Sequence, residues 1–291
     1  MTVGSYSVNR GTTVNRRRRI CVVGWMLCLG MVAGVAFPRA GYAQFFRVYE
    51  YKTADAGAVE FSYWTTYVVD SDETINYFDE GVLSREKLWA HSFEVEYGLS
   101  HKLTVGFYAD FMSPDDGNFE FIQSKLLARY RLFEKYELPV DIALYGEYII
   151  PDKDYADSEK FEFRTVIEKD IGPWRVALNP ILEKKTSGDD VEEGVEFAYA
   201  AGIYYDNGGD GLWNTTETHL RPGVEFYGDM GELSDPKGSS DRKHYIFPVI
   251  DLYCPRYGST KFHWNFGTGF GLGGQADDLV LKSIVTFEFI F

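Results

Sequence analysis

Residues 279–291 read LVLKSIVTFEFIF, and this stretch decides the fold of the chain. Apolar and polar residues alternate along it, and in a β-strand such alternation places the two kinds on opposite faces of a sheet. Thr286 and Glu288 lie on the polar face. The apolar face consists of Val285, Phe287, Phe289 and Phe291. Chain ends usually fray in water, so an apolar run that continues to the last residue needs an apolar surrounding.

An apolar face opposite a polar face, with phenylalanine as the last residue, resembles the carboxyl-terminal signal of Gram-negative outer-membrane β-barrel proteins. The resemblance implies an all-β fold, a transmembrane antiparallel up-and-down barrel of the porin-like or transporter-like kind, located in the bacterial outer membrane. It also implies that outer-membrane lipids and lipopolysaccharide surround the protein. The insertion signal that the barrel-assembly machinery would read is then Val285, Phe287, Phe289 and Phe291.

The first 43 residues have the features of a secretory signal peptide. Four arginines at 16–19 precede a mostly apolar stretch at 20–37, and Gly41-Tyr42-Ala43 offers a small-x-small cleavage site. A membrane anchor is the alternative, but glycines and Pro38-Arg39 favour cleavage. The mature chain then begins near Gln44. Residues 44–56 form a periplasmic lead-in or enter the lumen, and residues 57–291 form the barrel.

Removal of residues 1–43 makes the chain more acidic. This segment holds six of the 29 basic residues and no acidic residue, so the remainder has 23 basic against 44 acidic residues, a net charge of −21. Such an excess excludes nucleic acid as a partner, because phosphate binding needs clustered Lys and Arg. Cys21 and Cys28 leave with the signal peptide and Cys254 has no partner, so no disulfide is expected.

Runs of period 2 bounded by turn-forming residues predict twelve strands. Strand 119–133 is expected to point Ile122 toward lipid, and both faces of strand 243–254 are apolar, which leaves its orientation open. Long acidic loops alternate with short turns, as in outer-membrane barrels, and a soluble β-sandwich does not explain a greasy face opposite a charged one. The predicted strands are 57–70, 87–98, 102–112, 119–133, 140–150, 159–170, 174–185, 193–206, 215–228, 243–254, 261–272 and 279–291.

Charged residues of both signs occupy the positions predicted to face the lumen. Twelve strands lie between the small barrels that side chains fill and the large barrels that hold a water channel. These charges therefore either line a narrow pore or pair across the lumen and plug it. The predicted lumen-lining residues are Glu94, Glu96, Asp110, Lys125, Arg129, Arg131, Asp141, Glu147, Glu162, Arg164, Arg175, Arg221, Glu225 and Glu288.

The expected function is passive passage of small solutes through a narrow, charge-lined lumen, with no catalysis and no cofactor. A plugged barrel with a structural or surface-binding role is one alternative. The other is an outer-membrane lipid-modifying hydrolase, whose weak catalytic candidates are His91 and Ser113 at the outer ends of neighbouring strands. No histidine spacing indicates a metal site, and acidic pairs such as Asp277-Asp278 lack the spacing of a calcium loop.

Overall fold

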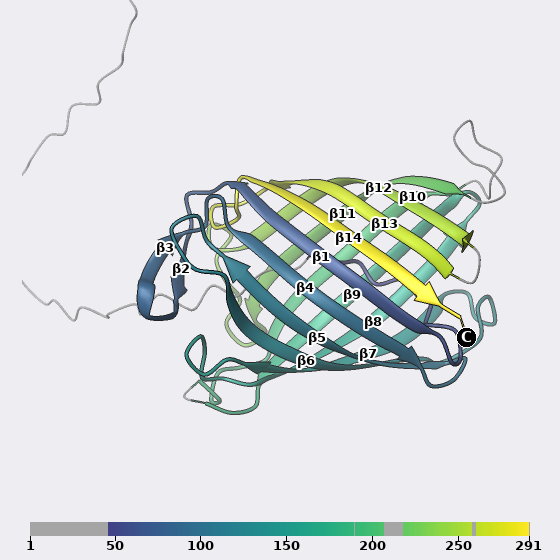
Figure 1. Cartoon of the computed structure of the whole chain (residues 1–291), viewed down its shortest axis with the longest axis horizontal. Coiled ribbons are helices and arrows are strands. Elements are labelled where there is room, and N and C mark those ends of the chain that lie inside the picture. The colour runs from purple at the N-terminus through teal and green to yellow at the C-terminus, as the bar shows by residue number, and fades with distance from the viewer. Residues whose placement is uncertain (1–45, 189, 207–217, 258–259, 291) are drawn as a thin grey trace, which may run out of the picture. The chain divides into compact units, whose positions relative to one another are not determined.

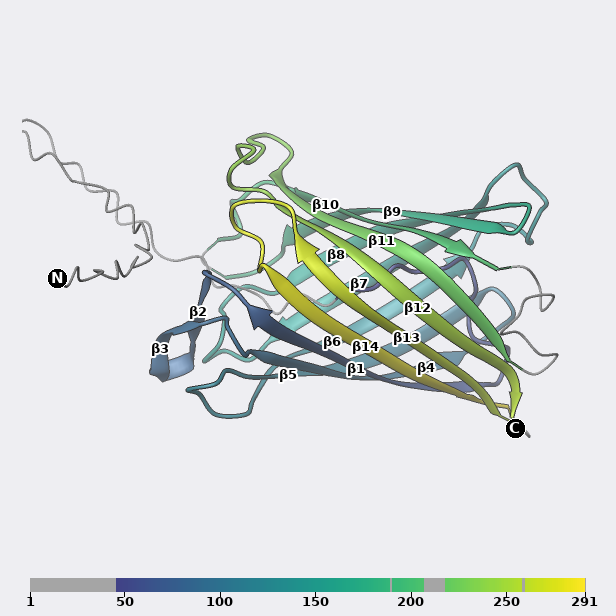
Figure 2. The ribbon, with the colours of Figure 1, turned by 90° about the horizontal axis from the view of Figure 1, so that it is seen from above.

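The computed structural model describes residues 46–188, 190–206, 218–257 and 260–290. In this part of the chain twelve strands close into a barrel (Figures 1 and 2). No helix among these residues is long and apolar enough to span a membrane. The predicted signal peptide lies outside the described residues. The barrel strands are β1 (Val59–Asp70), β4 (Trp89–Gly98), β5 (Leu103–Ser113), β6 (Glu120–Arg131), β7 (Asp141–Pro151), β8 (Lys160–Ile171), β9 (Trp174–Lys185), β10 (Glu196–Tyr205), β11 (His219–Glu232), β12 (Lys243–Tyr257), β13 (Thr260–Gly271) and β14 (Leu279–Phe289).

The strand order confirms the predicted up-and-down barrel. Each barrel strand pairs antiparallel with its neighbours, and β14 returns to β1, where Val59 lies opposite Phe289. Closure leaves no open sheet edge. Hydrogen bonds between neighbouring strands can therefore satisfy the backbone N–H and C=O groups, for which lipid offers no partners. The largest difference in a strand boundary is at β11, which was expected at residues 215–228 and is observed at His219–Glu232.

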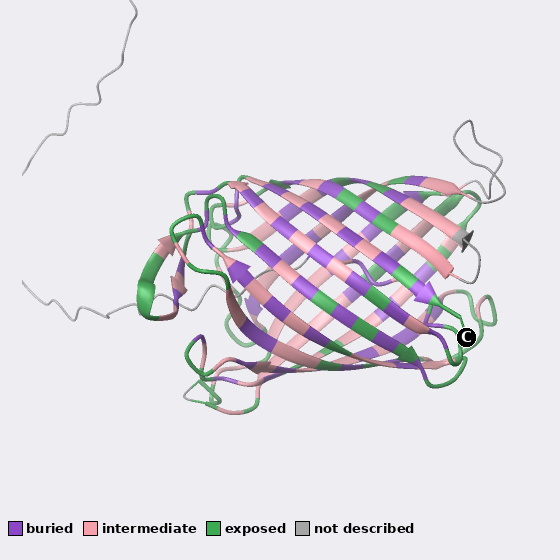
Figure 3. Cartoon of the chain, in the orientation of Figure 1, coloured by how far each residue is buried: buried purple, intermediate pink, exposed green. Residues whose placement is uncertain are grey.

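Burial alternates along the strands as the sequence pattern predicts. On β14, Phe287 and Phe289 are 37% and 40% exposed, whereas Glu288 between them is 3% exposed. Figure 3 shows the same alternation of buried and more exposed residues along neighbouring strands. The barrel wall therefore has an apolar exterior and a polar interior. Phe291 lies outside the described residues, and the role of the terminal strand as an insertion signal stays a prediction.

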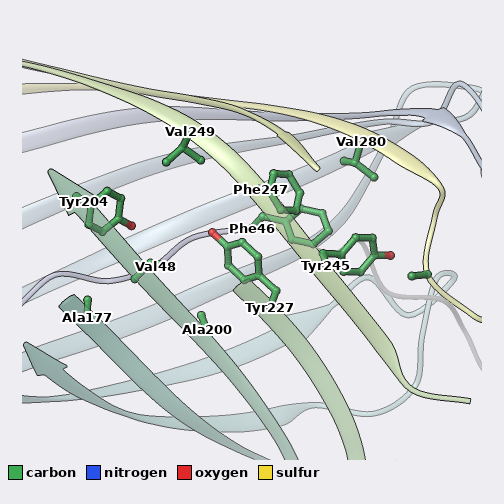
Figure 4. Packing of buried hydrophobic residues seen from close by; sticks show 11 residues of the cluster. Phe46, Val48, Ala177, Ala200, Tyr204, Tyr227, Tyr245, Phe247, Val249 and Val280 are labelled. Carbon is green, nitrogen blue, oxygen red and sulfur yellow. The ribbon is translucent and has the colours of Figure 1, made fainter. Parts of the chain in front are cut away.

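The orientation of β12, which the sequence left open, follows from what lies inside the barrel. Tyr245, Phe247 and Val249 are buried at 1%, 0% and 4%, whereas Ile250 is 51% exposed. The inward residues pack in one apolar cluster with Phe46 (Figure 4). Both faces of this strand are apolar because one faces outward and the other packs against an element inside the lumen.

The prediction that Ile122 faces lipid was wrong. The register between β5 and β6 shifts at this point, because Asp110 pairs with Gln123 and Phe111 pairs with Phe121. Ile122 is the extra residue of a bulge, and bulges re-aim side chains. Its side chain is fully buried and packs with Met112 and other apolar residues.

The two ends of the barrel differ in their connections. At the turn end, where β1 begins and β14 ends, connections such as 99–102 and 172–173 are short. At the opposite end, the loop end, connections such as 71–88 and 233–242 are longer. Bacterial barrels have short periplasmic turns and longer extracellular loops, so we expect the loop end to face outward.

The connection from β1 to β4 contains a small hairpin that the sequence pattern did not predict. It consists of β2 (Thr74–Tyr77), the 3₁₀ turn η1 (Phe78–Glu80) and β3 (Gly81–Ser84). Figure 1 shows it at the loop end, beyond the ends of the barrel strands. The buried Tyr77 anchors it, because its hydroxyl donates to the backbone carbonyls of Met112 (2.8 Å) and Asn118 (2.6 Å).

Candidate binding cavity in the barrel lumen

Residues 46–56, called the strap below, contact inward-facing residues of the barrel wall. Phe46 packs near the loop end against Tyr245 and Phe247, with ring centroids 4.9 and 4.6 Å apart (Figure 4). Ala54 lies near the turn end, where its N–H donates to Thr104 Oγ1 at 3.0 Å. The strap therefore runs along the inside of the lumen from the loop end to the turn end.

Asn179 on β9 holds the middle of the strap. Its Oδ1 accepts from the N–H of Tyr49 at 2.7 Å, and its Nδ2 donates to the carbonyl oxygen of the same residue at 3.0 Å. The Tyr49 hydroxyl reaches the hydroxyls of Tyr108 on β5 (2.7 Å) and Tyr145 on β7 (3.2 Å). All four residues are buried. The two bonds from Asn179 therefore satisfy backbone groups of the extended strap that water cannot reach.

The charged residues of the strap pair with the barrel wall. Arg47 lies 2.9 Å from Glu94 on β4, and Lys52 lies 2.9 Å from Glu288 on β14. Asp55 pairs with Lys261 on β13. Because β4, β14 and β13 lie within four consecutive strands of the barrel, these opposite charges hold the strap against one part of the wall.

The structure places all fourteen predicted lumen-lining residues among the buried or partly buried residues of the wall. On one side, Lys125 lies 3.2 Å from Asp110 and 3.5 Å from Glu147. Arg129 lies 2.8 Å from Glu96 on β4, two strands away. The buried members are Glu94, Glu96, Asp110, Arg129, Asp141, Glu147, Arg221, Glu225 and Glu288, and the partly buried members are Lys125, Arg131, Glu162, Arg164 and Arg175.

A cavity of about 470 Å³ lies between the strap and the wall. Residues at the turn end, such as Lys135 on the connection from β6 to β7 and Lys261 on β13, belong to its lining. Nine Lys or Arg and seven Asp or Glu line it, although acidic residues outnumber basic ones in the chain as a whole by 44 to 29. The lining is therefore cationic within an acidic protein, which favours anions inside the cavity.

Three arginines in the cavity lining retain an unused donor. Within the described residues, the Nε–H groups of Arg129, Arg131 and Arg221 are buried and have no hydrogen-bond partner. Buried polar groups usually have a partner in the protein or in ordered water. The three Nε–H groups are therefore unsatisfied donors inside the lumen.

The structure places the two hydrolase candidates diagonally across the β4–β5 ladder, and no hydrogen bond joins them within the described residues. Ser113 pairs with Trp89 across the β4–β5 ladder, whereas His91 pairs with Phe111. The Nδ1 atom of His91 lies 2.9 Å from the hydroxyl of Tyr63. No group of metal-ligating side chains that could hold an ion is found in the described ranges.

A charged cluster at the loop end is centred on Asp277, and the acidic pair Asp277-Asp278 gave no indication of it in the sequence. Arg85 donates from Nε and Nη2 to the two carboxylate oxygens of Asp277 at 2.8 and 2.9 Å. Ser71 Oγ donates to the same carboxylate at 2.7 Å and Tyr245 Oη at 3.1 Å. Burial alone would raise the pKa of Asp277, but the hydrogen bonds and charge of Arg85 outweigh burial and lower it. The cluster links the hairpin connection to the loop between β13 and β14.

No protein-family model and no curated protein matches the chain. Solved structures do match. The COG4313 outer membrane channel from Pseudomonas putida F1 is 14% identical, with a TM-score of 0.54 over 83% of this chain and 98% of that chain. The fold is that of a bacterial outer-membrane β-barrel. The predicted outer-membrane barrel class is therefore confirmed at the level of the fold.

Two further barrels resemble the chain less closely. The KdgM porin is 9% identical, with a TM-score of 0.44 over 80% of this chain and 99% of that chain. The translocator domain of the autotransporter NalP from Neisseria meningitidis is 7% identical, with a TM-score of 0.46 over 81% of this chain and 89% of that chain.

Proposed function

We propose that this protein is an outer-membrane channel that passes small polar solutes passively through a narrow, charge-lined lumen. The observation that carries the proposal is the cavity of about 470 Å³ inside a closed barrel, lined by charges of both signs. Charged rings in a confined, wet lumen select solutes by charge. The strap narrows the path, so passage depends on the space between the strap and the wall.

The exterior of the barrel supports a position in the outer membrane. Phe107 on β5, Leu126 on β6 and Phe161 on β8 are 47%, 53% and 43% exposed on the outer face. Apolar side chains exposed over several strands need lipid around them. We therefore also propose outer-membrane lipids and lipopolysaccharide as the surroundings of the barrel, and the barrel-assembly machinery as its route of insertion. The proposal needs no cofactor.

The hydrolase alternative lacks support from geometry. A serine nucleophile needs a base within hydrogen-bond reach, but no hydrogen bond joins Ser113 and His91 among the described residues, and His91 Nδ1 lies 2.9 Å from the hydroxyl of Tyr63 instead. His91 also stacks on Trp89, with ring centroids 5.8 Å apart, which is ordinary packing of aromatic side chains on the outer face.

Single-channel recording of the refolded mature chain in a planar bilayer tests the channel. We expect discrete conductance steps, and Arg129→Ala should shift the reversal potential toward cation selectivity because it removes a positive charge from the cavity lining. Arg164→Ala is the matched control: this lumenal arginine lies outside the cavity lining, and its removal should shift selectivity less. A folded wild-type barrel that gives no steps would contradict the proposal.

A further inference from the structure

A carboxylate of the strap lies between two arginines of the barrel wall. Glu50 Oε2 is 3.0 Å from Arg175 Nη1, and Glu50 Oε1 is 3.4 Å from Arg221 Nη1. The arginines come from β9 and β11, which flank β10 in the barrel. All three side chains line the cavity. The geometry shows that this arginine pair accepts a carboxylate supplied from inside the lumen.

The wall already supplies an acidic partner for each arginine. Arg175 Nε lies 3.1 Å from Asp170, and Arg221 pairs with Asp251. Neither arginine therefore depends on Glu50 for its only counter-charge. Arg221 also keeps a buried Nε–H without a hydrogen-bond partner among the described residues. The pair thus has more donors than its wall partners use.

We infer that the Arg175–Arg221 pair is a binding site for the carboxylate of a small organic anion, and that Glu50 occupies it as an internal substitute when no solute is bound. The inference rests on the proposed channel function and names the class of solute. Guanidinium groups present their donors in a planar fork that matches a carboxylate. The cationic balance of the lining draws anions toward the same place.

Competition with Glu50 makes binding weak enough for transport. A solute that enters must displace a charge-assisted contact, and when it leaves Glu50 can return. Channels require sites that are favourable enough to admit a solute and weak enough to release it. Two further acids lie beside the pair, Glu168 at 3.5 Å from Arg175 Nε and Asp206 at 3.9 Å from Arg221 Nη1, and they reject an anion that cannot reach the arginine donors.

Isothermal titration calorimetry on the refolded, detergent-solubilised mature chain tests the site. Sodium succinate is the probe, and neutral succinamide, which has nearly the same shape, is its control. Glu50→Gln should bind succinate about tenfold more tightly than the wild type, because the internal competitor loses its charge. Arg175→Lys keeps the charge but loses the fork, and it should bind succinate more weakly than the wild type.

Glu183→Gln is the matched control for Glu50→Gln. Its side chain is 23% exposed against 25% for Glu50, and it pairs with Lys160 on β8, outside the cavity lining. Succinate affinity should not change in this variant. The inference would be overturned if Glu50→Gln bound succinate no more tightly than the wild type. It would also be overturned if Glu183→Gln gained as much succinate affinity as Glu50→Gln, or if succinamide bound as tightly as succinate.

The calorimetric readout separates this inference from the channel proposal. Succinate binding that strengthens in Glu50→Gln, together with a silent bilayer, would support the site and contradict the channel. Conductance steps without any change of succinate binding in Glu50→Gln would support the channel and overturn the site.

Discussion

Deletion of residues 46–55 is expected to raise the single-channel conductance severalfold. This segment carries most of the strap, which crosses the lumen from the aromatic cluster around Phe46 to Thr104 near the turn end. The wall does not need it for closure, because β1 pairs directly with β4 and β14. Without the segment, water and ions fill the space that it occupies, and a twelve-stranded barrel has room for such a path.

Asn179→Ala should also raise the single-channel conductance, but less than the deletion does. It removes both hydrogen bonds to the backbone of Tyr49 and leaves the strand ladder intact. We expect more frequent transitions to a high-conductance level, because the strap leaves its position more often. The heat-modifiable gel shift of a folded barrel serves as the control for assembly. Unchanged conductance in the folded deletion variant would show that the strap does not limit the path.

Lys282→Met is expected to destabilise the barrel by about 3 kcal/mol, which is the scale for breaking a buried ion pair. Lys282 and Glu225 are 1% and 2% exposed and pair inside the lumen. Glu225 also accepts hydrogen bonds from Tyr204 at 2.9 Å and Asn265 at 3.2 Å. Removal of the lysine leaves a buried carboxylate whose remaining partners do not neutralise its charge. Urea unfolding in lipid vesicles, followed by tryptophan fluorescence, measures the change.

Two further variants show whether the stability lost in Lys282→Met comes from the unpaired charge of Glu225. The double variant with Lys282→Met and Glu225→Gln should recover most of the lost free energy of unfolding, because neither charge remains. Lys52→Met is the matched control, since Lys52 pairs with Glu288 but its side chain is 47% exposed. It should cost less than about 1 kcal/mol. Equal losses for the two lysines would contradict the assignment of Lys282 to a buried pair whose partner depends on it.

The strand pattern of this barrel could be predicted because lipid and lumen demand opposite chemistry on alternate residues. Phe287 and Phe289 face outward and Glu288 faces inward, as their alternation indicates. The same rule failed at Ile122, where a bulge shifts the register, because the inserted residue leaves no mark in the hydrophobic period. The alternation did not indicate the orientation of β12, because the inner face of this strand is also apolar and packs against Phe46.

The alternation predicts that the lumenal charges face inward, but it does not indicate their partners. Arg129 pairs with Glu96 two strands away, and Arg175 pairs with Glu50 on the strap. Such pairs depend on barrel curvature and on the course of a segment without its own ladder, and neither appears in the local sequence. For the same reason the sequence did not indicate that Asn179, one of several polar residues on β9, holds the backbone of Tyr49.

The position of the strap is tested most directly by cysteine protection at residue 48. Val48 is 8% exposed and packs with Ala177 and Ala200 inside the barrel, whereas Val82 of the hairpin is 56% exposed. Val48→Cys and Val82→Cys are compared in a Cys254→Ser background, in residues 44–291 folded in vesicles, with a polyethylene-glycol maleimide too large for the cavity. We expect Val82→Cys to react and Val48→Cys to react only after unfolding. Equal reaction rates in the folded barrel would contradict a strap inside the lumen.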